Sequence, residues 1–187
     1  MSDSSTVDGI TRKPLHTRAI TITGYQRSDG LFEVEGRLLD TKTFDFKPIS
    51  GDRVVPTGEP IHDMGVRIVY RQDMTVVDVI AVGHALPYAD CAAGPATLKS
   101  LIGLSMSKGW TAETRKRLAG AASCSHLAGL MAPMAAAAFQ SMVQFRLNRT
   151  PGAHTPTVDS CIAYSRHGEL MRTRYPAFYI AKAEDSA

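Results

Sequence analysis

The first half of the chain alternates between apolar or β-branched residues and polar residues, which is the pattern of half-buried strands. The alternation covers residues 18–25 (RAITITGY) and 31–46 (LFEVEGRLLDTKTFDF), with Gly30 in the turn between them. These two stretches predict a β-hairpin. A loop rich in proline and glycine follows at 47–60, and residues 65–86 hold two further β-rich runs joined by RQDM, which predicts a second hairpin.

After Pro87 the apolar residues recur at helical spacing instead. Helices are predicted over 94–110 and 111–120, and a long helix of mainly small and apolar residues is predicted over about 124–145. Pro133 either kinks this long helix or marks its first turn. Strands followed by helices predict an α+β fold, in which an antiparallel sheet from the N-terminal half packs against C-terminal helices, including one long buried helix.

The length of 187 residues and the hydrophobic fraction of 44% are those of a globular chain with a substantial core. Residues 1–17 are polar, and we expect them to form a flexible N-terminal arm before a single α+β domain at 18–187. The arm lacks the apolar stretch of a signal peptide. The apolar run at 127–145 is interrupted by proline and glutamine, so no membrane-spanning segment is predicted.

Charge and cysteine content restrict the partners of this chain. The net charge is only +3, and the basic residues are scattered, so nucleic acid is not expected as a partner. Three cysteines (Cys91, Cys124 and Cys161) do not make the paired framework of a secreted disulfide-rich domain. We expect a cytoplasmic protein with reduced thiols and a small-molecule substrate, without a membrane partner. A homo-oligomer is compatible with the sequence.

Cys124 and His126 stand at the start of the predicted long helix. Free N–H groups and the positive end of the helix dipole stabilise thiolates and bind anions at such a position. Both residues are therefore candidate catalytic residues. The alternative is that Cys124 is a small buried apolar side chain, as free cysteines commonly are.

His62 and Asp63 come just before a predicted strand and are also candidate catalytic residues, with His62 as a general base. Adjacent residues in an extended chain point to opposite faces. We therefore expect the carboxylate that orients His62 to come from another strand. The alternative is a turn histidine bonded to the backbone.

The second predicted strand is dense in charged residues. Alternation places Arg37 on one face and both Asp40 and Lys42 on the other. The planar guanidinium of Arg37 suits a carboxylate or a phenolate, so we interpret Arg37, Arg67 and Tyr88 as candidate substrate-binding residues. The alternative is an exposed sheet face with cross-strand ion pairs.

Cysteine and histidine together offer a candidate metal site. Zinc accepts thiolate and imidazole ligands, and the set would be Cys91, Cys124, His126 and His62. Zinc sites usually contain a short CxxC or HxxxH pair, whereas the close pair here is Cys124 with His126. The order of sheet, loop cysteine and helix cysteine is also similar to that of iron–sulfur scaffold proteins, although Cys161 lies beyond the long helix.

Five stretches carry a resemblance to a known family: GYQRSDGLFEVEGRLLDTK, GEPIHDMGVRIVY, PYADC, LIGLSMSKGW and CSHLAGLMAPMAAAAFQSM. In order and spacing, over about residues 18–145, they resemble a bacterial family catalogued as domain of unknown function 2889. The family pattern has Gly-Cys-Thr-His where this chain has Ser-Cys-Ser-His, so Cys124 and His126 match and Ser123 replaces the glycine. The resemblance implies selection on these polar motifs. It does not indicate which activity they serve, because the family has no established activity.

The remaining motifs narrow the class of function. No Gly-rich phosphate loop follows a strand and no GxSxG elbow occurs, which disfavours nucleotide cofactors and serine hydrolases. The polar residues that remain suit proton abstraction and elimination. The leading hypothesis is therefore an enzyme without a cofactor, of lyase, hydratase or isomerase type, acting on an anionic or phenolic catabolite, including aromatic ones. The alternatives are a metal- or sulfur-binding module, with zinc as the metal, and an assembly or regulatory protein without catalysis.

Overall fold

The computed structural model describes residues 5–49, 53–147 and 157–182. Contacts divide the chain into two compact units, Met1–Val143 and Gln144–Ala187. All the candidate site residues belong to the first unit. The single domain predicted for residues 18–187 stays a prediction.

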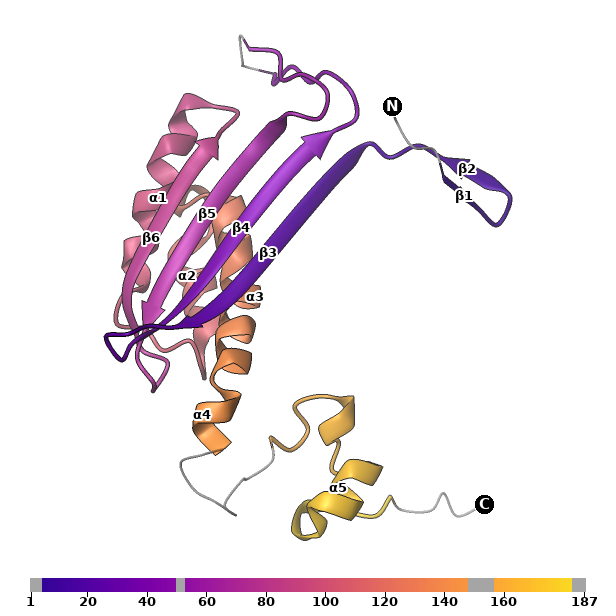
Figure 1. The fold of residues 1–187 in the computed structure, drawn as a ribbon, viewed down its shortest axis with the longest axis vertical. Coiled ribbons are helices and arrows are strands. Elements are labelled where there is room, and N and C mark those ends of the chain that lie inside the picture. The colour runs from indigo at the N-terminus through magenta and orange to yellow at the C-terminus, as the bar shows by residue number, and fades with distance from the viewer. Residues whose placement is uncertain (1–4, 50–52, 148–156, 183–187) are drawn as a thin grey trace. The chain divides into compact units, whose positions relative to one another are not determined.

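The first unit is built on a four-stranded antiparallel sheet (Figure 1). Its strands are β3 (His16–Gln26), β4 (Phe32–Lys42), β5 (Pro60–Tyr70) and β6 (Val76–Ala85), and they pair in the order β3-β4-β5-β6. Strands that are consecutive in the sequence are therefore neighbours in the sheet, and both predicted hairpins are confirmed. Gly30 has a φ of 83°, which suits its place in the first tight turn.

The N-terminal arm and the loop after β4 contain more structure than the sequence predicted. Within the arm, β1 (Ser5–Val7) pairs with β2 (Ile10–Arg12), and β3 already begins at His16. Beyond β4, Phe46 forms an isolated bridge with Val55 instead of continuing the strand. Residues 1–4 and 50–52 lie outside the described residues.

The helices of the first unit follow the strands and lie on one face of the sheet (Figure 1), which confirms the α+β class. The helix predicted over 94–110 is broken, because Gly103 has a φ of 87° and donates its N–H to the carbonyl of Val76. The α-helices of the first unit are α1 (Gly94–Thr97), α2 (Trp110–Leu118) and α3 (Ser125–Ser141), and α4 (Val143–Leu147) spans the boundary. Short 3-10 helices occupy Ala89–Ala93, Leu98–Leu101 and Gly120–Ala122.

The long helix α3 begins directly after Cys124, and Pro133 lies inside it. The alternative that Pro133 marks its first turn is therefore wrong. Two glycines let this helix approach the sheet closely: a Cβ on Gly36 would lie 2.8 Å from the Met134 sulfur, and a Cβ on Gly24 would overlap Ser141. The glycines of β3 and β4 thus let the middle and the end of α3 pack closely against these two strands.

The core lies between the sheet and these helices. It is formed by fully buried apolar side chains of both layers, among them Val34, Leu38, Met64, Ile68, Leu127, Leu130 and Met134. The indole N–H of Trp110 donates to the carbonyl of Met131 at 2.8 Å and ties α2 to α3. In the described part of the first unit, no helix covers the opposite face of the sheet (Figure 1).

The described residues of the second unit form short helices joined by turns. It contains α5 (Glu169–Arg174) and 3-10 helices at Ile162–Tyr164 and Pro176–Phe178. Asp159 accepts a hydrogen bond from the backbone N–H of Arg166, which closes the loop before α5. Within the described residues, no helix of either unit has the length and apolar character needed to cross a bilayer.

Candidate functional site

Three side chains form a row across three neighbouring strands on the helix-covered face of the sheet. Arg18 on β3 and His62 on β5 are the direct cross-strand partners of Asp40 on β4. Arg18 donates two hydrogen bonds of 2.8 Å to the two carboxylate oxygens of Asp40. Nδ1 of His62 lies 3.0 Å from Oδ2 of the same carboxylate. The register of the sheet therefore places one buried carboxylate between a cation and an imidazole.

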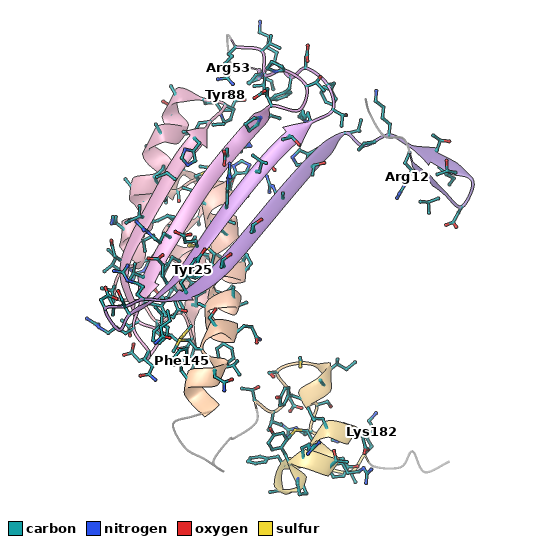
Figure 2. The ribbon with its side chains drawn as sticks, in the orientation of Figure 1. Arg12, Tyr25, Arg53, Tyr88, Phe145 and Lys182 are labelled. Carbon is teal, nitrogen blue, oxygen red and sulfur yellow. The ribbon has the colours of Figure 1, made fainter. Side chains whose placement is uncertain are left out.

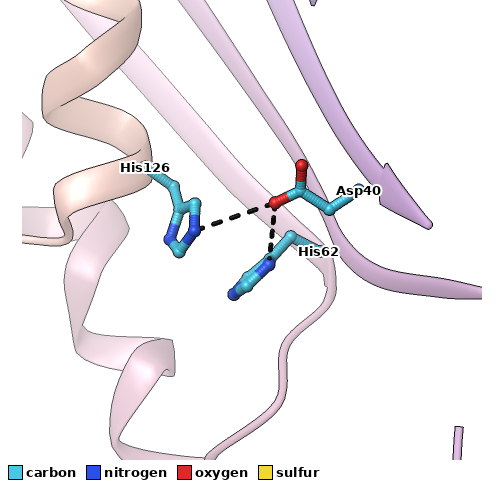
Figure 3. Close-up of side chains that lie close together, drawn as sticks. All are labelled: Asp40, His62 and His126. Atoms are coloured by element: carbon cyan, nitrogen blue, oxygen red, sulfur yellow. Dashed lines mark hydrogen bonds and ion pairs between the residues drawn. The ribbon is translucent and has the colours of Figure 1, made fainter. Parts of the chain in front are cut away.

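Two further histidines complete the surroundings of Asp40. Nε2 of His16, two residues before Arg18, lies 3.2 Å from Oδ1. His126, in the first turn of α3, brings its ring to a centroid distance of 3.8 Å from the ring of His62. Its Nε2 lies 3.8 Å from Oδ2 of Asp40, which is too long for a hydrogen bond (Figure 3). Strands β3 to β5 and helix α3 thus converge on one carboxylate.

The charge states follow from burial and from these neighbours. Burial acts to raise the pKa of Asp40, but the hydrogen bonds and charge of Arg18 outweigh it and hold that pKa below its usual value. Burial lowers the pKa of His62, although Asp40 opposes this effect. Burial also lowers the pKa of His126, and the adjacent His62 acts in the same direction. At neutral pH the carboxyl group of Asp40 is therefore ionised, and the rings of His62 and His126 are neutral.

The tautomer of His62 is fixed by its partner. An ionised carboxylate only accepts hydrogen bonds, so the proton of the neutral His62 ring is on Nδ1 and points to Asp40. Nε2 then has a free lone pair, and it points away from Asp40 (Figure 3). This arrangement of carboxylate and imidazole is the one that orients a general base.

Two adjoining cavities meet at this site, and His62, His126, Pro87 and Tyr88 line both. The first, of about 510 Å³, is lined in addition by His16, Arg18, Asp40, Lys42, Phe46 and Ile61. We call it the histidine cavity. The second, of about 350 Å³, is lined in addition by Cys91, Cys124 and residues of α1 and the start of α3, and we call it the cysteine cavity. Tyr88 lies at the end of the sheet opposite to Tyr25 (Figure 2).

The structure brings together most of the predicted catalytic residues. His62, Cys124 and His126 line the cysteine cavity, together with Tyr88. Sγ of Cys124 lies 3.8 Å from Nδ1 of His126. Cys124 is the residue before the first turn of α3, so the helix start positions both of these side chains.

Asp63, Arg37 and Arg67 are not part of this site. Successive residues of a strand point to opposite faces, so Asp63 points away from the face that holds His62. Asp63 instead accepts hydrogen bonds of 2.8 and 2.6 Å from Arg37. Arg37 and Arg67 line a groove on the uncovered face of the sheet. Arg37 and His62 therefore lie on opposite faces of the sheet, and the expectation that both act on one substrate does not fit this geometry.

Comparison with known families supports the resemblance seen in the sequence. Residues 16–140 match the family model described as "Protein of unknown function (DUF2889)". The chain belongs to the DUF2889 family. The matched segment includes every residue of the site, from His16 to His126. No curated protein and no solved structure matches the chain.

The metal-ligand set predicted from the sequence is also revised. In this DUF2889 chain, the group of potential ligands whose atoms all lie within 4.8 Å of one another, among the described residues, is Asp40, His62 and His126. It contains neither Cys91 nor Cys124. Both cysteines face the neighbouring cavity, and zinc binding through the four predicted residues stays a prediction without a converged site.

Sequence reasoning missed Asp40, Arg18, His16 and Lys42 as parts of the site. Alternation did place Asp40 and Lys42 on the face opposite to Arg37, and the partner of His62 was expected on another strand. The missing step is the register of β4 against β5, which pairs Asp40 with His62. The tight turn at Gly30 makes the register of β3 against β4 predictable from the sequence. The register of β4 against β5 is not predictable in this way, because a long loop joins these two strands.

Proposed function

We propose that this DUF2889 protein is an enzyme without a cofactor that transfers protons on a small anionic or phenolic catabolite, including aromatic ones, by lyase, hydratase or isomerase chemistry. The observation that supports this best is the hydrogen bond of 3.0 Å between Nδ1 of His62 and the buried carboxylate of Asp40. Nε2 of His62 is the general base. As it takes a proton, Asp40 stabilises the imidazolium that forms.

The walls of the histidine cavity support an anionic substrate with an apolar body. Lys42 brings an ammonium group and His16 an imidazole to the lining of this cavity, together with Arg18, which is already bonded to Asp40. Phe46 and Ile61 supply apolar surface to the same cavity. The ammonium of Lys42 lies 5.1 Å from the centre of the Phe46 ring, so the anion site adjoins the apolar wall. Lys42 takes the binding role that the sequence assigned to Arg37.

A second imidazole lies beside the general base and lines the same cavity. His126 packs against the ring of His62 and lines both cavities, and Cys124 lies beside its other nitrogen. Elimination, hydration and isomerisation each need one proton removed and one delivered. His62 removes the proton next to an electron-withdrawing group, and the imidazolium that forms returns a proton to the leaving group or to the neighbouring carbon. The neutral ring of His126 stacks beside this base and does not carry the proton.

The cellular setting is also a proposal. Cys91, Cys124 and Cys161 are free thiols, which favours a reducing cytoplasmic compartment. A small-molecule partner without nucleic acid or membrane accords with the near-neutral charge of +3.

The experiment is a screen of acidic and phenolic catabolites, followed by kinetics of His62→Ala. Loss of one acid–base group costs roughly 10²–10⁴-fold in turnover, and we expect at least the lower figure. His84→Ala is the matched control, because His84 is exposed and lines the groove on the other face of the sheet. A substrate whose turnover falls equally in both variants, or survives His62→Ala, would contradict the proposal.

A further inference from the structure

We propose that Asp40, His62 and His126 form a binding site for one divalent transition-metal ion. The three side chains come from β4, β5 and α3, which lie far apart in the sequence, and their ligand atoms lie within 4.8 Å of one another (Figure 3). Asp40 is only 2% exposed, so its carboxylate is a buried and fixed ligand. This site goes beyond the proposed proton-transfer function and does not depend on it.

The distances around Oδ2 of Asp40 fit a bridging ion. Nδ1 of His62 lies 3.0 Å from this oxygen, and Nε2 of His126 lies 3.8 Å from it. Two metal–ligand bonds of about 2.1 Å that meet at a tetrahedral angle hold their outer atoms about 3.4 Å apart. Both observed distances differ from this value by a few tenths of an ångström. The three ligand atoms all lie within 4.8 Å of one another, so rotation of the two rings would bring their nitrogens onto one ion.

The donor set selects the class of metal. Two imidazoles and one carboxylate suit Zn²⁺, Co²⁺, Fe²⁺ and Mn²⁺, and they do not suit Ca²⁺ or Mg²⁺, which take oxygen ligands. Three protein ligands leave at least one coordination position for water. Because His62 and His126 both line the histidine cavity of about 510 Å³, that position has room for a small molecule.

Outer partners hold these ligands in orientation. Arg18 donates two hydrogen bonds to Asp40, and the Cys124 sulfur lies 3.8 Å from the nitrogen of His126 that faces away from Asp40. Such partners fix the carboxylate and the imidazole tautomer of metal sites. The charge of Arg18 repels a cation, so its contribution is orientation at some expense of affinity.

An ion in this site and the general base exclude each other. Ligation by Nδ1 of His62 replaces its hydrogen bond to Asp40 and leaves the ring proton on Nε2. That nitrogen then donates and no longer accepts a proton. We therefore expect Zn²⁺ to inhibit the proton-transfer reaction.

The test is titration of the full chain, first treated with a chelator, with Co²⁺ and Zn²⁺. Visible absorption reports Co²⁺ coordination and calorimetry reports Zn²⁺ affinity. We expect one bound ion, and a loss of about 100-fold or more in affinity for His126→Ala and His126→Gln, since loss of even an outer partner costs 10–100-fold. These variants keep the Asp40–His62 pair. His84→Ala is the control and should bind like the wild type.

Circular dichroism and thermal melts show whether each variant is folded, and two substitutions at His126 guard against a folding defect in one. Absence of ligand-field bands with Co²⁺, or bands that persist in both folded His126 variants, would overturn the metal site. Turnover that depends on His62 in protein that binds no metal would leave the proposed function intact. Metal binding by a protein that turns over no substrate would support the metal site and contradict the proposed function.

Discussion

Asp40 and His62 lie directly opposite each other on strands β4 and β5, and Nδ1 of the histidine is 3.0 Å from the carboxylate. This register places both side chains side by side on the helix-covered face of the sheet. A shift of one residue would turn one of the two side chains to the other face. Arg18 supplies the charge that keeps the buried carboxylate ionised. The pair therefore combines a fixed imidazole tautomer with an open cavity.

Asp40→Asn should reduce turnover of the substrate by roughly 10²–10⁴-fold, with a much smaller change in KM. An amide can bond either nitrogen of His62 and no longer stabilises the imidazolium. Steady-state kinetics measure the effect. Asp63→Asn is the control, since Asp63 bonds Arg37 on the other face of the sheet, and equal losses in the two variants would count against the Asp40–His62 pair.

Lys42→Met should raise KM by about 10-fold or more and change kcat little, because a hydrogen bond to a charged group contributes about 1.5–3 kcal/mol. Lys42→Arg should restore part of the binding. Arg37→Met should leave both constants unchanged, because Arg37 lies outside the histidine cavity. A larger effect for Arg37→Met than for Lys42→Met would return the anion site to the uncovered face.

Arg18→Met should destabilise the protein by about 1.5–3 kcal/mol, because it removes two charge-assisted hydrogen bonds from the buried Asp40 carboxylate. Urea unfolding at neutral pH measures the free energy. The loss should shrink in the double variant Arg18→Met with Asp40→Asn, which no longer buries an unpaired charge. Additive effects of the two substitutions would contradict this coupling.

Gly24→Ala should destabilise the fold by about 1–3 kcal/mol, because the new methyl group overlaps Ser141 at the end of α3. Ser141→Gly removes the side chain that the methyl group meets. A double-mutant cycle should therefore show a favourable coupling between the two substitutions, after allowance for the cost of glycine in a helix. Thermal melts of all four proteins provide the comparison.

Alkaline pH should weaken the fold through Tyr70. Burial raises the pKa of Tyr70 to about 12 from its ordinary value of 10.0. The folded state therefore binds the phenol proton more tightly than the unfolded state, and the contribution is complete below pH 10 and is lost between about pH 10 and 12. Two pKa units correspond to about 2.7 kcal/mol. Tyr70→Phe should lack this part of the pH dependence in urea unfolding.

The hairpins were predictable because residues 18–25, 31–46 and 65–86 alternate with a period of two over most of their length. The same rule showed that Asp63 could not orient His62. The alternation could not identify Asp40 as the partner of His62, because the register between β4 and β5 depends on a loop without periodicity and on a register shift between Asp40 and Thr41. A helix was predicted through Gly103, where a positive φ and pairing with Val76 end it.

Cys124 and His126 were predictable as a pair, because a loop followed by a long apolar run marks a helix start. The strands that lie opposite Cys124 and His126 were not predictable, since they depend on how α3 packs over Gly24 and Gly36. Arg37 lies on the uncovered face of the sheet and pairs with Asp63, which is the cross-strand ion pair that the sequence left open as the alternative.

The most direct test of the Asp40–His62 pair is the tautomer of His62, measured by long-range proton–nitrogen correlation spectra of the ¹⁵N-labelled protein at neutral pH with chelator present. We predict a protonated Nδ1 and an unprotonated Nε2 for this residue, with that preference lost in Asp40→Asn. A ring with its proton on Nε2 in the wild type, or a ring charged at neutral pH, would contradict the assignment of His62 as a general base.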